Sequence, residues 1–343
     1  MRHQKKTKVI LMRLFRFTFL FLLFSLATNV SAQSIIQTTL SPNQLPPPPS
    51  NWAKKNKLGF DISEIAFLNW SAGGTSSVSG LFKGEFSRVY NKGNHRWANE
   101  LLLKYGLNKQ DGIELRKTDD AMALNSTYGF RKDTTSNWFY SAKFNFNTQF
   151  TNGYNYPNRD IAISKPFAPA YIFLGAGAEN SNKEKNRTFY FSPITLKTTL
   201  VLDQYLANQG AFGVKKAVYI VDPNDPTSTI LVEQGDQIKT EFGILCTGYM
   251  KSEIYKNVFF ENRLSLYSDY LNKFGNVDID YDTRLDLVVN AYVKANIGVH
   301  LLYDDDIKTK KDVVDDAGAT TQVNDGPRLQ LKQVLGVGIV YAF

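Results

Sequence analysis

Apolar and polar residues alternate one by one through the last seventeen residues of the chain, 327–343. A period of two places each series on its own face of a strand, and about ten residues let a tilted strand cross a bilayer. The segment is therefore predicted to be the closing strand of an outer-membrane β-barrel, with Tyr341 and Phe343 at the membrane-water boundary. An edge strand of a soluble β-domain is the alternative.

The amino terminus has the pattern of an export signal. Six basic residues precede the apolar run 17–26, namely Arg2, Lys5, Lys6, Lys8, Arg13 and Arg16. Small and polar residues follow the run, and Val30 and Ala32 favour cleavage after Ala32. Residues 1–32 are predicted to be a cleavable secretory signal peptide, with an uncleaved anchor helix as the alternative.

Loss of this segment changes the charge of the chain. The full sequence has 40 Lys and Arg against 32 Asp and Glu, and the mature chain keeps 34 against 32. Because no region carries a dominant basic stripe, nucleic acid is not expected as a partner. The single cysteine, Cys246, excludes both a lipid-anchored cysteine near the cleavage point and a disulfide framework. No apolar run approaches the length of a transmembrane helix.

Residues 33–56 contain four consecutive prolines and are predicted to be a stiff periplasmic spacer, with a disordered tail or a binding segment as alternatives. Residues 57–343 form the predicted barrel. Alternating segments lie near 58–69, 77–90, 95–108, 120–131, 137–150, 169–179, 188–203, 239–255, 257–271, 277–292, 295–304 and 328–343. The fold class is thus all-β, a single antiparallel transmembrane barrel of about twelve strands.

The connections between these segments alternate in length, as bacterial outer-membrane barrels require. Short periplasmic turns are expected at 91–94, 132–136, 180–186, near 256 and near 293–294. Longer extracellular loops are expected at 108–119, 151–168, 203–239 and 305–327. A soluble sandwich has no reason to sort its loops in this way.

One face of several segments is apolar and the other is charged. Charges facing hydrocarbon would cost about 2 to 4 kcal/mol each at the bilayer centre, so the charged face is predicted to line the lumen and the apolar face to contact outer-membrane lipid. A soluble barrel turned inside out gives the same alternation, but the export signal and the aromatic residues near strand ends favour the membrane. The predicted lumen residues are Glu100, Lys104, Glu261, Arg263, Asp280, Asp282, Arg284 and Asp286.

Several short motifs resemble those of a known family. They are Asn69-Trp70-Ser71-Ala72-Gly73-Gly74, Arg116-Lys117-Thr118-Asp119-Asp120, Gly153-Tyr154 with Tyr156-Pro157, Phe167-Ala168-Pro169-Ala170-Tyr171, Gly210-Ala211-Phe212-Gly213, Tyr303-Asp304-Asp305-Asp306-Ile307 and Val334-Leu335-Gly336-Val337-Gly338. Their order is similar to that in the Gram-negative outer-membrane barrel family known only as domain of unknown function 3078. The resemblance implies a barrel in the cell outer membrane and no established activity.

Catalytic and metal chemistry find little support in the sequence. The mature chain has only two histidines, His95 and His300, and no Ser-His-Asp spacing. One cysteine and two isolated histidines cannot complete a four-ligand zinc site. We expect a protein that is not an enzyme and has no cofactor and no metal.

The outer loops carry a second group of candidate residues: Trp70, Arg116, Lys117, Asp119, Asp120, Asp304, Asp305 and Asp306. The aspartates near residue 305 could offer oxygen ligands to calcium. Lysines at 308, 310 and 311 lie among them, so a solvated loop of mixed charge is favoured. The Arg116-Lys117 pair beside Asp119-Asp120 is predicted to be a loop ion-pair cluster rather than an anion site.

Two functions remain open at this stage. Twelve strands lie between the small filled barrels and the large porins, so a narrow channel for small polar solutes is one. A structural or adhesion barrel acting through its extracellular loops is the other, with the lumen closed by salt bridges and folded-in loops. The terminal Tyr341 and Phe343 are predicted to be the signal that the barrel-assembly machinery reads. Sequence leaves the solute, the oligomeric state and other partners open.

Overall fold

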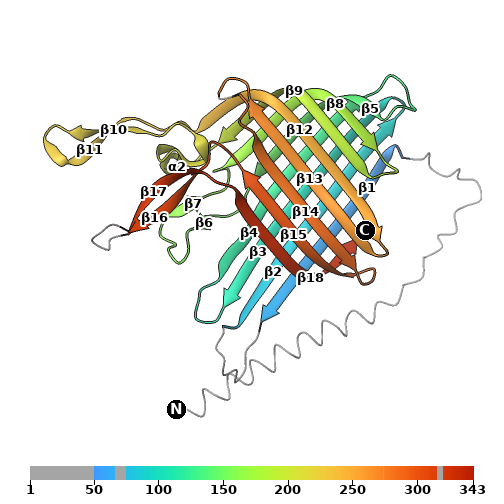
Figure 1. The fold of residues 1–343 in the computed structure, drawn as a ribbon, viewed down its shortest axis with the longest axis horizontal. Helices are drawn as coiled ribbons and strands as arrows, with labels where there is room; N and C mark the ends of the chain where they lie inside the picture. Colours follow the sequence, from blue (N-terminus) through green and yellow to red (C-terminus); the bar gives the residue numbers. More distant parts are fainter. Residues whose placement is uncertain (1–49, 66–74, 273, 315–319) are drawn as a thin grey trace, which may run out of the picture. The chain divides into compact units, whose positions relative to one another are not determined.

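A computed structural model describes residues 50–65, 75–272, 274–314 and 320–343. Twelve antiparallel strands form one closed barrel (Figure 1). They are β1 (Trp52–Ile65), β2 (Ser77–Lys92), β3 (His95–Gln110), β4 (Arg116–Phe130), β5 (Trp138–Thr148), β8 (Ala170–Asn182), β9 (Arg187–Leu200), β12 (Ile238–Tyr255), β13 (Val258–Asp269), β14 (Asp278–Val288), β15 (Val293–Tyr303) and β18 (Gln330–Ala342). The predicted fold class is confirmed, and each of the twelve predicted segments overlaps one of these strands, although residues 66–69 of the first segment lie outside the described residues. The predicted signal peptide lies outside the described residues.

The first and last strands close the barrel. β1 pairs with β18 so that Leu58 lies opposite Tyr341 and Ile62 opposite Val337. The terminal Phe343 N–H donates to Asn56 O at 3.1 Å, and Asn56 N–H donates back to Phe343 O at 3.2 Å. The expected pairing of the two ends of the chain is thus confirmed.

β1 begins earlier than the sequence indicated. Trp52 is already opposite Tyr90 of β2, so residues 52–56, which the sequence assigned to the spacer, belong to the sheet. The Trp52 ring lies 5.2 Å from that of Tyr90 and 5.8 Å from that of Trp97. Cross-strand aromatic contacts of this kind favour strand pairing. They hold residues 52–56 in the sheet, although apolar and polar residues hardly alternate in this lysine-rich segment.

The connections sort by length at the two ends of the barrel. At one end two-residue turns join β2 to β3 and β12 to β13, and Gly93 and Asn257 adopt the positive φ that such turns need. The last short turn occupies residues 289–292 rather than 293–294. Asn290 Oδ1 accepts hydrogen bonds from the backbone N–H groups of Tyr292 and Val293. The resulting Asx turn allows β15 to begin at Val293.

The opposite end carries the long connections. They contain β6 (Gly153–Tyr154) with β7 (Ala162–Ser164), α2 (Gln204–Asn208), the 3₁₀ turn η1 (Ala211–Gly213), β10 (Val218–Asp222) with β11 (Asp225–Glu233), and β16 (Lys308–Val314) with β17 (Thr320–Pro327). A small apolar core, formed by Ala168, Val201, Leu206, Ala207 and Val214, packs α2 against this end. No helix in the described part of the chain is long and apolar enough to cross a membrane.

The outer face of the barrel is apolar and exposed. Along β18, Leu331, Leu335 and Ile339 are 66%, 70% and 61% exposed. Inward residues show the reverse pattern, since Asp286 and Glu261 are 8% and 7% exposed. The predicted assignment of faces is confirmed: apolar side chains point outward and charged side chains point inward. This distribution, with the sorted connections, is that of an outer-membrane β-barrel.

One strand contains a proline that a regular ladder would not accept. Pro193 lies within β9, and both ladders of this strand shift register there, against β8 and against β12. Proline has no backbone N–H to donate to the ladder, and a bulge at Pro193 leaves this position outside the regular hydrogen-bonded pairing. On β8 the same bulge brings the backbone so close that a Cβ at Gly177 would lie 2.0 Å from Phe191 O. Glycine at 177 is therefore required for the close approach of β8 to β9.

Candidate functional site in the lumen

A dense group of charges in the lumen surrounds Glu261 of β13. Lys251 Nζ and Arg284 Nη2 lie 2.6 and 3.0 Å from Glu261 Oε2, and Arg263 Nη2 lies 3.3 Å from Oε1. Asp286 completes the group, with its carboxylate 3.0 Å from Arg284 Nε and 3.5 Å from Lys251 Nζ. Each charge therefore has a partner of opposite sign, as buried charges require.

Two ion pairs cross the interior from one wall to another. Arg263 Nη1 of β13 lies 3.3 Å from Glu100 Oε2 of β3, and these two strands are opposite in the closed order of the barrel. Lys104 Nζ of β3 lies 3.9 Å from Asp282 Oδ2 of β14. We call Glu100, Lys104, Arg263 and Asp282 the central charge bridge. Strand alternation predicts that these residues face inward, but only the curvature of the barrel brings them together.

The remaining predicted lumen residue, Asp280, accepts a hydrogen bond from His300 Nε2 at 2.8 Å. Both side chains stay open to water although they point inward, with exposures of 57% for Asp280 and 36% for His300. Lys104 and Asp282 are similarly 41% and 38% exposed. The lumen around these four residues is therefore wet rather than densely packed. All eight predicted lumen residues lie on the inner face.

Sequence reasoning missed several interior pairs. Lys83 Nζ of β2 contacts Asp61 Oδ2 at 2.5 Å. Arg96 of β3 forms an ion pair with Glu179 of β8, although β4 and β5 lie between them. Lys143 Nζ donates to Thr247 Oγ1 at 2.9 Å. The period-two position of each charge in its strand is the signal that could have marked it.

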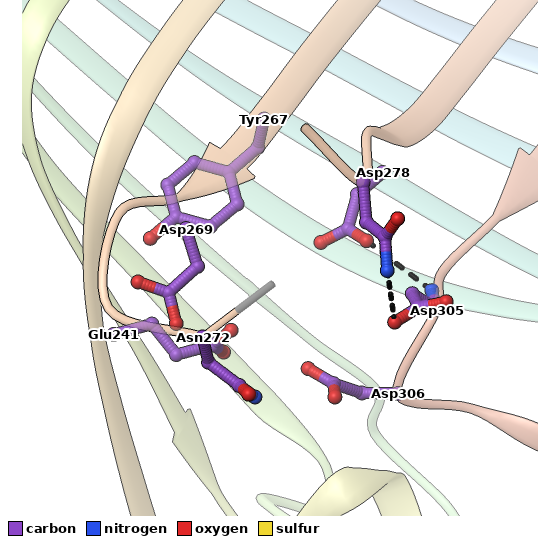
Figure 2. A pocket seen from close by; sticks show the side chains of 8 residues that line it. Glu241, Tyr267, Asp269, Asn272, Asp278, Asp305 and Asp306 are labelled. Carbon is purple, nitrogen blue, oxygen red and sulfur yellow. Dashed lines mark hydrogen bonds between the residues drawn. The ribbon is translucent and has the colours of Figure 1, made fainter. Parts of the chain in front are cut away.

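The loop end of the lumen holds an acidic cluster (Figure 2). Lys197 of β9 is 5% exposed, and its Nζ lies 2.6 Å from Asp278 and 3.6 Å from both Glu241 and Asp304. Asn276 Nδ2 donates to Asp305 at 2.8 Å. We call this group the outer mouth. A cavity of about 20 Å³ beside this group has room for about one water molecule and is lined by Glu241, Tyr267, Asp269, Asn272, Asn276, Asp278, Asp305 and Asp306.

Asp304, Asp305 and Asp306 are anchored to the barrel rather than placed in a solvated loop. Asp304 is 13% exposed beside Lys197, and Asp306 forms an ion pair with Lys239. No group of three or more His, Cys, Asp or Glu side chains among the described residues has metal-site geometry. The four aspartates that follow, Asp312, Asp315, Asp316 and Asp325, all lie outside the residues whose side chains are described.

Arg116, Lys117, Asp119 and Asp120 lie at the start of β4 rather than in the connection before it. Asp120 accepts hydrogen bonds from Lys117 Nζ at 2.7 Å and from the backbone N–H of residues 150 and 151 at 2.8 and 2.9 Å. The expected ion pair therefore forms, and it ties down the connection that follows β5. Asp119 contacts Lys332 of β18 at 2.6 Å, and the Arg116 guanidinium lies 5.3 Å from the centre of the Tyr156 ring.

The other predicted residues are at the ends of the chain and in the loops. Trp70 lies outside the described residues. Tyr341 and Phe343 are exposed on the outer face, 56% and 60%, with ring centres 5.5 Å apart. His95 Nδ1 is 2.6 Å from Tyr128 Oη at the short-turn end, and among the described residues it belongs to no group of three or more potential metal ligands.

Asp203 holds the long connection between β9 and β12. Partial burial opposes its ionisation, but Lys165 Nζ at 2.6 Å and the Leu206 N–H at 3.0 Å outweigh this effect and lower the pKa of the carboxyl group. Asp203 is also the N-cap of α2, where a side-chain acceptor satisfies a free backbone N–H.

The barrel can now be compared with known proteins. Residues 62–154 match the family model described as Protein of unknown function (DUF3078). The resemblance to that family is confirmed. The match runs from β1 to β6, and the motifs after residue 154 lie beyond it. No curated protein matches the sequence.

Three solved structures are similar at low sequence identity. The translocator domain of the autotransporter NalP from Neisseria meningitidis is 8% identical, with a TM-score of 0.35 and coverage of 85% of this chain and 88% of that one. The COG4313 outer membrane channel from Pseudomonas putida F1 is 12% identical, with a TM-score of 0.39 and coverage of 89% and 100%. The β-domain of the Bordetella autotransporter BrkA is 9% identical, with a TM-score of 0.30 and coverage of 85% and 99%. We draw no functional conclusion from these three.

Proposed function

We propose that this protein is an outer-membrane channel for small polar or ionic solutes, narrowed by the central charge bridge. The observation that carries the proposal is the exposure of charged side chains that point into the barrel. Asp280, Asp282 and Lys104 are 57%, 38% and 41% exposed although strands surround them on all sides. If the lumen were filled only to stabilise the barrel, these side chains would be buried in close ion pairs, since a buried charge without a partner is strongly destabilising.

The same geometry supports a narrow pathway rather than a wide one. Glu100 and Arg263 reach each other from opposite walls, so a solute has to pass beside this pair or displace it. Rings and pairs of charged side chains are a common basis of ion selectivity in pores. The charges of both signs favour small, strongly hydrated solutes over large or apolar ones.

The proposed location is the cell outer membrane, reached through a cleavable signal peptide and the barrel-assembly machinery. The exposed apolar face of β18 supports a lipid environment, since contiguous exposed apolar surface of this extent is not stable in water. Membrane fractionation and heat-modifiable migration in detergent test the location. A protein that fractionates with the soluble periplasm contradicts it.

Conductance of the refolded mature chain in a planar bilayer tests the channel. We expect reproducible steps, and a rise in unit conductance of about twofold when Glu100→Gln and Arg263→Gln are combined, because both members of the crossing pair then lose their charge. A charge reversal, Asp282→Lys, is expected to shift selectivity toward anions.

The matched control removes an ion pair outside the barrel. Lys215 Nζ lies 2.5 Å from Glu233 Oε1 next to the β10–β11 hairpin, and both side chains are half-exposed. The pair Lys215→Gln and Glu233→Gln should leave conductance unchanged. If neither the native protein nor the Glu100/Arg263 variant gives conductance steps while both are folded as barrels, the channel proposal is wrong.

The β10–β11 hairpin favours a second candidate function, adhesion through the outer loops. Apolar side chains stay exposed on this hairpin, with Val221 at 60%, Val232 at 59% and Ile220 at 49%. Figure 1 shows the hairpin extending away from the barrel strands. Replacement of Val218–Asp222 and Asp225–Glu233 by a Gly-Ser linker should abolish surface binding of the cells and leave conductance intact. Unchanged surface binding excludes this role.

A further inference from the structure

The short-turn end of the lumen holds a second, larger cavity. It measures about 510 Å³ and is lined by residues at the β2–β3, β4–β5 and β8–β9 turns. Pockets that bind small molecules measure roughly 300 to 1,000 Å³. None of the four residues of the central charge bridge lines this cavity. We call it the vestibule.

Cationic side chains dominate the lining of the vestibule. Lys92, Arg96, Arg131 and Lys183 line it together with one carboxylate, Glu184. Within the part of the chain that the structure describes, Lys92 and Lys183 have neither an ion-pair nor a hydrogen-bond partner for their ammonium groups. Two positive charges are therefore left for solvent or for a ligand.

The two arginines are held in place by the barrel. Arg96 forms its ion pair with Glu179, which is 4% exposed. Arg131 Nη1 donates to Ser136 O at 2.8 Å, and its guanidinium lies 5.2 Å from the centre of the Phe139 ring. A guanidinium fixed in this way loses little entropy when it binds an anion, and it is suited to carboxylate and phosphate groups.

Phe139 also lines the vestibule, but its ring is 6% exposed and lies against the Arg131 guanidinium, so it offers a ligand little apolar surface. The fixed polar groups of the pocket are cationic, so the complementary ligand is an anion.

We propose that the vestibule binds a small anion, held through a carboxylate or phosphate group by Lys92, Arg96, Arg131 and Lys183. This inference goes beyond the proposed channel, because binding at the short-turn end requires no passage through the central charge bridge. A barrel that conducts nothing can still bind the anion here.

The test uses the full mature chain refolded in detergent micelles, with phenyl phosphate, benzoate and inorganic phosphate as separate calorimetric probes. We expect one site per chain for each of the three anions, and no binding of neutral benzyl alcohol. The relative affinities of phenyl phosphate and benzoate show whether the site prefers phosphate or carboxylate. Combined Lys92→Gln and Lys183→Gln substitutions should weaken binding on the order of tenfold.

The matched control removes two lysines from the same turns that do not line the vestibule. Lys132 and Lys185 are exposed and absent from the lining, so Lys132→Gln with Lys185→Gln should change the affinity less than twofold. Heat-modifiable migration checks that each variant is folded. Absence of binding to the native protein overturns the proposal, as does an equal loss of affinity in the control pair, which would indicate diffuse charge attraction.

Discussion

The outer mouth and the vestibule are both rich in charge, but they use it differently. In the outer mouth Lys197 is 5% exposed and contacts three carboxylates within 3.6 Å. In the vestibule Lys92 and Lys183 are exposed and have no ion-pair partner among the described residues. The first arrangement joins three strands and a loop, and the second leaves charge available. Charge density alone therefore does not indicate a binding site. Whether the charges are already paired within the protein decides whether they are available to a ligand.

The largest expected effect comes from breaking the outer mouth. A Lys197→Met substitution leaves Asp278, Glu241 and Asp304 without their shared cation, and an unpaired buried charge costs about 3 to 5 kcal/mol. Urea unfolding in micelles, followed by tryptophan fluorescence, measures the loss.

The corresponding change in an exposed pair supplies the control. Lys215→Met removes a cation that is 53% exposed, and exposed ion pairs contribute about 0 to 1 kcal/mol. If both substitutions lower the free energy of unfolding equally, the outer mouth is not a structural cluster and the contrast with the vestibule fails.

An intermediate effect is expected at the short-turn end, where the chain terminates. Deletion of Phe343 removes an exposed aromatic ring and two backbone hydrogen bonds to Asn56. If the barrel-assembly machinery reads this residue, the amount of folded barrel in the outer membrane should fall several-fold while export continues. Cell fractionation with the heat-modifiability assay measures this, and Phe343→Tyr is the control because it keeps an aromatic terminus. Normal membrane levels of the deletion variant remove the proposed role.

The smallest expected effect is a pH dependence of the long connection between β9 and β12. Because the folded protein lowers the pKa of Asp203, ionised Asp203 stabilises the long connection above the unfolded pKa of about 4, and this contribution is lost as pH falls through the folded value. Loss of this N-cap costs about 1 kcal/mol. The protection factor of the Leu206 amide, which is the intrinsic exchange rate at each pH divided by the observed rate, should therefore fall below pH 4.

The Asp203→Asn variant isolates this carboxyl group. Asparagine retains the capping oxygen but cannot ionise, so the acid-dependent loss of protection should disappear in the variant. An identical pH profile for the native protein and the variant shows that another group controls the connection.

Much of this fold follows from local pattern. The period of two fixed which residues face lipid and which face the lumen, because successive side chains alternate across a strand. The turns followed from the same pattern wherever Gly or Asn interrupts it, as at Gly93. Predictions were least accurate where the pattern is weak, as in the lysine-rich start of β1, and where one side chain decides the end of a turn, as at Asn290.

The candidate site likewise has one part that the sequence predicts and another that it does not. Sequence by itself determined that Glu100, Arg263 and Asp282 point inward. Only the tertiary structure decided that Glu100 meets Arg263 across the barrel and that Lys197 gathers three carboxylates while Lys92 and Lys183 have none. The physical reason is that strand stagger and closure set which inward residues share a height and a wall, and these are properties of all twelve strands together.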